Sequence, residues 1–90
     1  MEKRFARSEQ VVWNMVDEEA VLLNPETGLY YGLNRTASEV WQALVNPQTT
    51  AHLVTHIANV FEAPADVVGA DIEALLADLT AKKLVVVLAD

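Results

Sequence analysis

The chain has 90 residues, of which 52% are hydrophobic, and a formal net charge of −7. A chain of this length forms one domain, and this apolar content excludes intrinsic disorder. The absence of cysteine excludes disulfides and thiol chemistry, and the longest apolar runs are too short to span a membrane. We therefore expect a cytoplasmic protein without a signal peptide.

The N-terminus holds half of the positive charge. Three of the six basic residues lie in the first seven positions, at Lys3, Arg4 and Arg7. We expect a flexible tail over residues 1–9 and a single domain over residues 10–90. Without the tail the domain is more acidic still, so it repels nucleic acid and anionic membranes and attracts basic peptides.

The first half of the domain is predicted to form three β-strands. Residues 10–16 and 19–24 are rich in β-forming residues and are separated by a two-residue acidic turn. A second turn is expected from Asn24 to Gly28, because proline presets φ and glycine accepts the left-handed conformation. The third strand covers residues 29–34. Connections this short imply an antiparallel meander.

A helix is expected directly after the third strand. Thr36 and Glu39 have the spacing of a capping box, so the helix should begin at Thr36 and extend to about Val45. The corner between strand and helix is only two residues long. The helix is therefore expected to pack on the sheet to which its own strand belongs.

Two further helices and a short strand complete the predicted elements. One helix is capped by Thr49 or Thr50, and another extends from Pro64 to about Ala81. Gly69 inside the last helix costs about 1 kcal/mol relative to alanine, which suggests close packing there. A terminal strand over residues 84–88 is a candidate to cover the edge of the first strand.

The third strand has an open edge in this arrangement. No charge or proline within residues 29–33 blocks it, and an edge of this kind is a liability unless something binds there. Side chains alternate between the two faces of a strand. Since Leu33 precedes the helical corner, Leu29, Tyr31 and Leu33 should face the helices, and Tyr30 and Gly32 should face away.

Catalytic and metal sites are not predicted. His52 and His56 are four residues apart, but no third ligand is spaced for a zinc site, so both are interpreted as surface histidines. The acidic residues of the third helix form its solvated face. Ser38 is explained by capping in the first turn of its helix. No catalytic constellation, cofactor site or phosphate loop is found.

Two patterns resemble the PqqD-like family. The first is Gly28-x-Tyr30-Tyr31-x-Leu33-Asn34-x-Thr36-Ala37-x-x-Val40-Trp41. The second is Val68-x-x-Asp71-Ile72-x-x-Leu75-Leu76-x-x-Leu79, followed by Leu84-Val85. The resemblance spans roughly residues 10–88. Lys83 departs from it, since the family often has glycine before the final leucine, and this departure concerns the C-cap of the third helix.

This resemblance implies an α+β, winged-helix-like fold in which a three-stranded antiparallel β-meander is followed by a three-helix bundle. It implies a non-catalytic recognition element that binds the leader of a ribosomally made precursor peptide and presents the peptide to processing enzymes. Those enzymes are a leader peptidase and a cyclase, as for lasso peptides, or a radical SAM enzyme, as for the quinone cofactor PQQ.

In the family the leader adds as a strand beside the third strand and lies in the cleft before the third helix. The resemblance therefore places the peptide-binding residues of this chain at Leu29, Tyr30, Tyr31, Gly32, Leu33, Val67, Val68, Asp71, Ile72, Leu75 and Asp78. The acidic balance of the chain favours a basic leader.

Two alternatives come from other functional classes. A winged-helix DNA-binding transcription regulator is compatible with the topology, but its third helix would enter the groove with four acidic residues. A metal-dependent enzyme would be built on His52 and His56. Whether the protein forms a homodimer is left open by the sequence.

Overall fold

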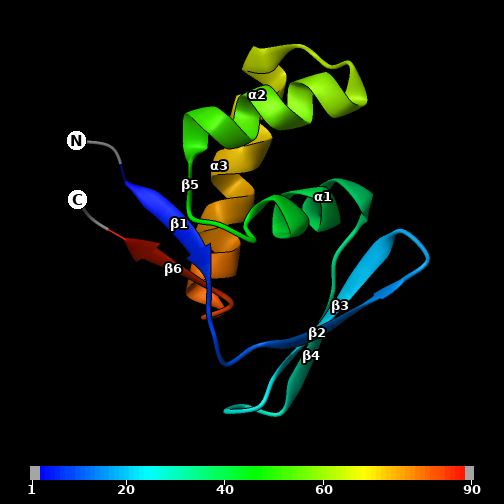
Figure 1. The fold of residues 1–90 in the computed structure, drawn as a ribbon, viewed down its shortest axis with the longest axis vertical. Helices are drawn as coiled ribbons and strands as arrows, with labels where there is room; N and C mark the ends of the chain where they lie inside the picture. The colour runs from blue at the N-terminus through cyan, green and yellow to red at the C-terminus, as the bar shows by residue number, and fades with distance from the viewer. Residues whose placement is uncertain (1–2, 89–90) are drawn as a thin grey trace.

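The computed structural model describes residues 3–88 and places six strands and three helices within them (Figure 1). In chain order these elements are β1 (Arg4–Arg7), β2 (Val12–Val16), β3 (Glu19–Asn24), β4 (Leu29–Gly32), α1 (Arg35–Ala43), β5 (Gln48–Thr49), α2 (Thr50–Phe61), α3 (Ala65–Ala81) and β6 (Val85–Leu88). Within residues 3–88 no helix is both long and apolar enough to cross a bilayer.

The predicted meander is confirmed as an antiparallel sheet in the order β2-β3-β4. Asp17 occupies the first tight turn with a φ of 57°. At the second turn the side chain of Asn24 accepts a hydrogen bond from the Glu26 N–H at 3.0 Å, and Gly28 takes a φ of 75°. The left-handed conformation expected of that glycine is therefore present.

At the corner between β4 and α1, the helix is capped by a different side chain from the one predicted. Asn34 is the N-cap, and its side chain accepts a hydrogen bond from the Ala37 N–H at 2.8 Å. The predicted capping box is wrong, because Asn34 starts the helix before Thr36 can cap it. The carboxylate of Glu39 lies instead 3.1 Å from the ring of His56.

Ser38 connects three elements and does not act as a cap. Its buried hydroxyl accepts a hydrogen bond from the Ala20 N–H at 2.7 Å and lies 3.1 Å from the carbonyl oxygen of Leu33, to which it donates. Ala20 belongs to β3, whereas Leu33 follows β4. This one hydroxyl therefore holds α1 against the end of the sheet.

The second and third helices follow the sequence prediction closely. The side chain of Thr49 caps α2 by accepting from the His52 N–H at 3.1 Å, and Pro64 precedes the first turn of α3. The close packing expected at Gly69 is wrong. A Cβ atom placed at Gly69 would meet nothing within 4 Å.

The C-terminus of α3 is a Schellman motif. The Leu84 N–H donates to the Leu79 carbonyl at 3.0 Å, and the Lys83 N–H donates to the Thr80 carbonyl at 3.0 Å. Leu79 and Leu84 are both buried, which supplies the apolar contact typical of this motif. Lys83 takes the left-handed position with a φ of 61°.

A second sheet, in the order β5-β1-β6, was not predicted. The expectation of a flexible tail over residues 1–9 is wrong for Arg4–Arg7, which form β1, and residues 1–2 lie outside the described range. β6 pairs along the whole of β1, with Arg4 opposite Leu88 and Arg7 opposite Val85. The terminal strand therefore covers β1, and it does not cover the edge of β2.

Arg7 ties this second sheet to α1. Its guanidinium donates to the carbonyl oxygens of Trp41 at 2.8 Å and Gln42 at 3.2 Å, near the end of the helix. It also lies 4.7 Å from the ring centroid of Trp13 and 5.1 Å from that of Trp41. Burial lowers the pKa of Arg7. The carbonyl and ring contacts offset the cost of that burial.

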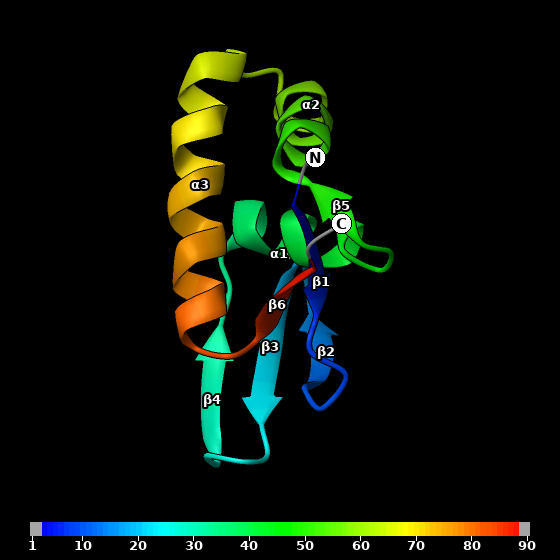
Figure 2. The same cartoon turned by 90° about the vertical axis from the view of Figure 1, so that its left-hand side faces the viewer.

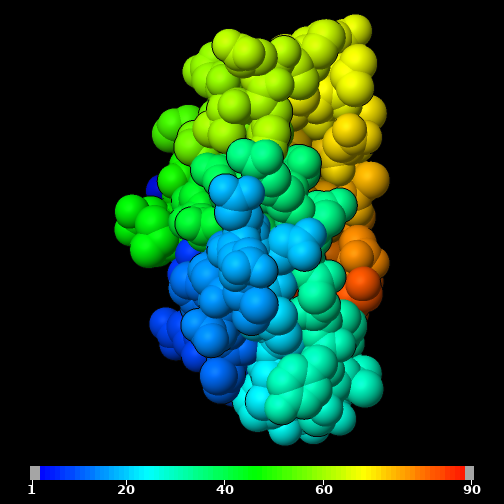
Figure 3. Space-filling view, turned by 90° about the vertical axis from the view of Figure 1, so that its right-hand side faces the viewer, coloured from blue at the N-terminus to red at the C-terminus, as the bar shows by residue number. Residues whose placement is uncertain are grey.

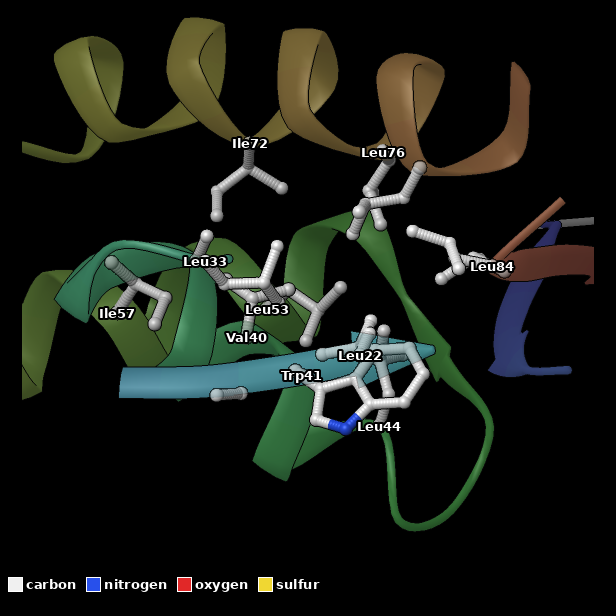
Figure 4. Packing of buried hydrophobic residues seen from close by; sticks show 14 of the residues in the cluster. Leu22, Leu33, Val40, Trp41, Leu44, Leu53, Ile57, Ile72, Leu76 and Leu84 are labelled. Atoms are coloured by element: carbon white, nitrogen blue, oxygen red, sulfur yellow. The ribbon is translucent and has the colours of Figure 1, made fainter. Parts of the chain in front are cut away.

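The core lies where α3 crosses α1, α2 and β3 (Figure 4). Here the apolar side chains of α3 pack against apolar side chains from α1, α2 and β3. The cluster includes Leu22, Leu33, Val40, Trp41, Leu44, Leu53, Ile57, Ile72, Leu76 and Leu84. The fold is thus α+β, as predicted, with α1 packed against β3 of the meander and α2 packed against α3 and α1.

Candidate functional site

The edge strand β4 has one hydrogen-bonded side and one open side. Among residues 3–88 it pairs only with β3, so that Tyr31 lies opposite Leu22 and Gly32 opposite Val21. The Leu33 N–H donates to the Ala20 carbonyl at 2.9 Å. Hydrogen-bonded pairs alternate along an antiparallel ladder. The backbone groups of Tyr31 therefore point to β3, and those of Tyr30 and Gly32 point out of the sheet.

Tyr30, Tyr31 and Leu33 divide as predicted between the two faces, but Leu29, expected toward the helices, is 54% exposed and outside the core. Leu33 is buried and Tyr31 is half-buried against the core, whereas Tyr30 is 71% exposed. The opposing core-face residues of β3, Ala20 and Leu22, are completely buried. The helix-facing side of β4 thus presents apolar side chains beside an open backbone edge.

A groove of about 370 Å³ separates β4 from the C-terminal half of α3. Figure 2 shows the end of β4 meeting the C-terminal end of α3, and Figure 3 shows the two segments adjacent at the surface. The groove brings together six of the predicted residues, namely Tyr30, Tyr31, Gly32, Leu33, Leu75 and Asp78. It also includes Asn34, Ala37, Leu79, Lys82 and Leu84, which were not among the predicted peptide-binding residues.

Lys82 gives the groove a positive charge that was not predicted. Its ammonium group lies 2.9 Å from the carboxylate of Asp78 and 5.2 Å from the ring centroid of Tyr31. This ion pair could have been predicted from the sequence, because Asp78 and Lys82 are four residues apart, the spacing at which side chains meet on a helix. The rim of the groove is therefore mixed in charge, although the chain as a whole is acidic.

Five predicted residues do not line the groove. Val68 and Ile72 point into the core and are at most 5% exposed. Asp71 is on the exposed surface of α3, and Leu29 and Val67 are more than half exposed. These five residues were placed in the site from the family resemblance, which maps whole segments and does not distinguish a core position from a groove position.

A larger hollow of about 530 Å³ lies on the other side of α3, lined in part by Phe5, Thr50, Glu73, Leu76 and Val87. The central strand β1 contributes Phe5 to it, and β1 is paired on both sides, by β5 and β6. A central strand offers no open backbone to a peptide, and the edge strands β5 and β6 contribute one residue each to this lining, Thr49 and Val87. The groove beside β4 is lined instead by three consecutive residues of an edge strand. For a peptide ligand, the smaller groove beside β4 is the better candidate.

Metal-binding chemistry has no support among residues 3–88, where no group of three histidine, aspartate or glutamate side chains is gathered closely enough to hold an ion. His56 faces Glu39 of α1 at 3.1 Å, and His52 is exposed. The two histidines therefore have different environments: His56 contacts α1, and His52 faces solvent.

Comparison with known proteins identifies relatives of this fold. The sequence profile of the family described as coenzyme PQQ synthesis protein D (PqqD) matches residues 19–85. A search among curated proteins finds no match. The chain is similar to TbiB1, solved in complex with the TbiA(beta) leader peptide, with 30% sequence identity and a TM-score of 0.85. That alignment covers 94% of this chain and 99% of TbiB1.

Two more distant structures share the fold. Lasso peptide synthetase B1, solved with its leader peptide, has 24% identity and a TM-score of 0.80, over 91% of this chain and 96% of that one. The PqqD part of Methylobacterium extorquens PqqCD, described as a stand-alone RiPP recognition element, has 21% identity and a TM-score of 0.76, over 92% and 88% of the two chains. Because the family profile covers most of the sequence and TbiB1 matches almost end to end, the chain belongs to the PqqD family.

Proposed function

We propose that this protein is a non-catalytic leader-peptide-binding protein, which binds the leader of a ribosomal precursor peptide by β-strand addition and presents it to processing enzymes. The observation that carries this proposal is the open edge of β4 beside the groove of α3. Support comes from TbiB1, which shares the fold at 30% identity and was solved with a leader peptide.

Strand addition would use the backbone of β4 for affinity and the groove for selectivity. Tyr30 and Gly32 each offer an outward N–H and C=O, and each ladder hydrogen bond contributes about 0.5–1.5 kcal/mol. Apolar leader side chains that enter the groove beside Tyr31 and Leu75 add about 1.5–3 kcal/mol each when fully buried. After ordering costs, a few of each contact give affinities in the micromolar range or better.

The processing enzymes follow from the family. They are either a leader peptidase with a cyclase, as in lasso-peptide biosynthesis, or a radical SAM enzyme of the PQQ type. The protein itself supplies no reacting group in this proposal. Its contribution is to raise the local concentration of the precursor at the enzyme and to fix the leader in an extended conformation.

The charge of α3 does not favour DNA binding. Asp71, Glu73 and Asp78 are all on its exposed surface, and Asp78 already holds Lys82 at 2.9 Å. A recognition helix of this kind would bring carboxylates toward phosphates. No observation supports the transcription-regulator alternative over peptide binding.

The open edge is tested by two substitutions at one position. Gly32→Pro removes the outward N–H of β4, and proline is tolerated on an edge strand where the N–H faces away from the ladder. Gly32→Ala keeps the N–H, and its Cβ would meet nothing within 4 Å. Leader affinity, measured by calorimetry with leaders encoded beside the gene, should fall roughly tenfold or more for proline and little for alanine.

The groove has its own matched pair on α3. Leu75→Asp places a charge in the groove, whereas Ala70→Asp places the same charge on the exposed surface of the same helix. Leader binding should be lost only in the first variant, with folding of both checked by circular dichroism. Equal binding by the proline and alanine variants at Gly32, or by both aspartate variants, would contradict strand addition at β4.

A further inference from the structure

The outer face of the meander, which the helices do not cover, contains a hollow of about 420 Å³. Its lining includes Gly32 on β4 and Val21 on β3, which lie opposite each other in the ladder, and it extends to Leu33 and Asn34 at the corner before α1. A Cβ atom at Gly32 would meet nothing within 4 Å, so the missing side chain leaves open space on this face. Val16, 55% exposed, borders the hollow on β2.

The hollow is continuous with the edge at which the leader would add. Residues opposite each other in a sheet project their side chains from the same face. Gly32 belongs to the outer face, because its neighbours Tyr31 and Leu33 face the core. The leader residue opposite Gly32 therefore projects onto the outer face, over a glycine that presents no side chain to oppose it.

Two carboxylates line the part of this hollow that is farthest from the edge of β4. Asp17 and Glu19 both line it. Within the described part of the chain, neither lies within salt-bridge distance of a basic side chain, although the neighbouring Glu18 pairs with Arg35 at 3.4 Å. Asp17 and Glu19 are thus available to a cation from outside the molecule.

The distance to be crossed selects a long side chain. Glu19 is on β3, two strand spacings across from a leader added beside β4 and two residues along the strand from Val21, which is roughly 12 Å in all. Small and aliphatic side chains are too short to span this distance, and an aliphatic one has nothing to offer the carboxylate. Lysine and arginine have both an apolar stem, which can lie over Gly32 and Val21, and a cationic end.

We infer that the leader of this protein carries a lysine or arginine opposite Gly32, whose side chain crosses the outer face of the sheet to Glu19 and Asp17. This inference rests on the proposed strand addition at β4. It adds a second point of selection to the groove. The leader is read on both faces of its strand, with apolar side chains toward α3 and one basic side chain on the opposite face.

The test uses peptides selected from a random phage-displayed library against the wild-type protein. Peptides that protect the amides of Tyr30 and Gly32 from exchange are kept, and cross-strand NOEs identify the peptide residue opposite Gly32. That residue should be lysine or arginine. Changing it to alanine or leucine should weaken binding by about two- to fivefold, the range of an exposed ion pair.

Charge reversal then identifies the partner. Glu19→Lys should weaken binding of the selected peptide about fivefold, and changing the basic peptide residue to glutamate should restore it. Glu26→Lys, in the turn between β3 and β4, is the matched control, because it changes the net charge equally at a site away from the hollow. A second variant, Gly32→Val, fills the hollow and should weaken binding independently of charge.

The outcomes separate this inference from the proposed function. Selected peptides that protect β4 but carry an aromatic, aliphatic or acidic residue opposite Gly32 would overturn the inference and leave strand addition standing. Equal effects of Glu19→Lys and Glu26→Lys, without rescue by the reversed peptide, would also overturn it. If no selected peptide protects Tyr30 and Gly32, the proposed function itself fails and the inference fails with it.

Discussion

Lys83 ends α3 in a backbone conformation that suits glycine. Its φ of 61° lies in the left-handed region, where a Cβ atom costs roughly 1–2 kcal/mol. The Schellman hydrogen bonds around it need only the backbone. Lys83→Gly should therefore raise the free energy of unfolding by about 1 kcal/mol, as measured by urea denaturation.

Lys83→Ala is the control for this substitution. It removes the same charge and the same side-chain stem but keeps the Cβ atom, so it should bring little of the gain. An alanine variant as stable as the glycine variant would show that the charge of Lys83, and not its backbone strain, limits stability.

Some residues of the site follow from the sequence alone, and others do not. Alternation along β4 was sufficient to place Tyr31 and Leu33 on the core face and Tyr30 on the outer face, because a strand has only two faces. Helical periodicity could not tell the groove residue Leu75 from the core residue Ile72. Both occupy the apolar stripe, and their environments differ only through the packing of α3 against β4.

At the scale of elements, the edge of β4 makes a distinctive pattern of amide exchange. The N–H groups of Tyr31 and Leu33 point to β3, whereas those of Tyr30 and Gly32 point to solvent. In the free protein the first pair should exchange slowly and the second pair rapidly. Saturation with a leader peptide should slow the second pair selectively, as measured by NMR, while residues of α2 show almost no chemical-shift change.

A different pattern would locate the peptide elsewhere. Protection that appears along β2, β5 or β6, the other edge strands of the two sheets, would move the site to that strand. Shifts concentrated in α2 would mean that the partner contacts a helical surface and adds no strand.

The sequence predicts elements well where the signal is local. The turns at Asp17 and Gly28 and the cap at Thr49 were recognised from adjacent residues, and the strands and helices they bound were confirmed. β1 was missed because its partner β6 lies at the other end of the chain. Four residues rich in charge carry no strand signal until that distant apolar partner pairs with them.

At the scale of the whole molecule, the net charge of −7 should act mainly on the rate of association. The ion pair of Asp78 and Lys82 cancels locally, so steering comes from the remaining acidic surface. The on-rate of a basic leader should fall about tenfold between roughly 0.05 M and 0.5 M salt in stopped-flow measurements, with a much smaller change in the off-rate.

A leader variant of zero net charge serves as the control and should associate at a rate that depends little on salt. An on-rate for the basic leader that is flat across the same range would mean that the acidic surface plays no part in recruitment. The groove and the open edge would be unaffected by that result.

The cluster of Arg7, Trp13 and Trp41 has a consequence for optical measurements. These are both of the tryptophans in the chain, and their ring centroids are 6.2 Å apart. Within the described residues neither lines the groove beside β4. Intrinsic fluorescence therefore monitors one junction, where the N-terminal strand meets α1 and the meander, and is insensitive to a peptide that docks rigidly at the opposite edge. A change in tryptophan emission on leader addition would signal that the sheet itself shifts against the helices.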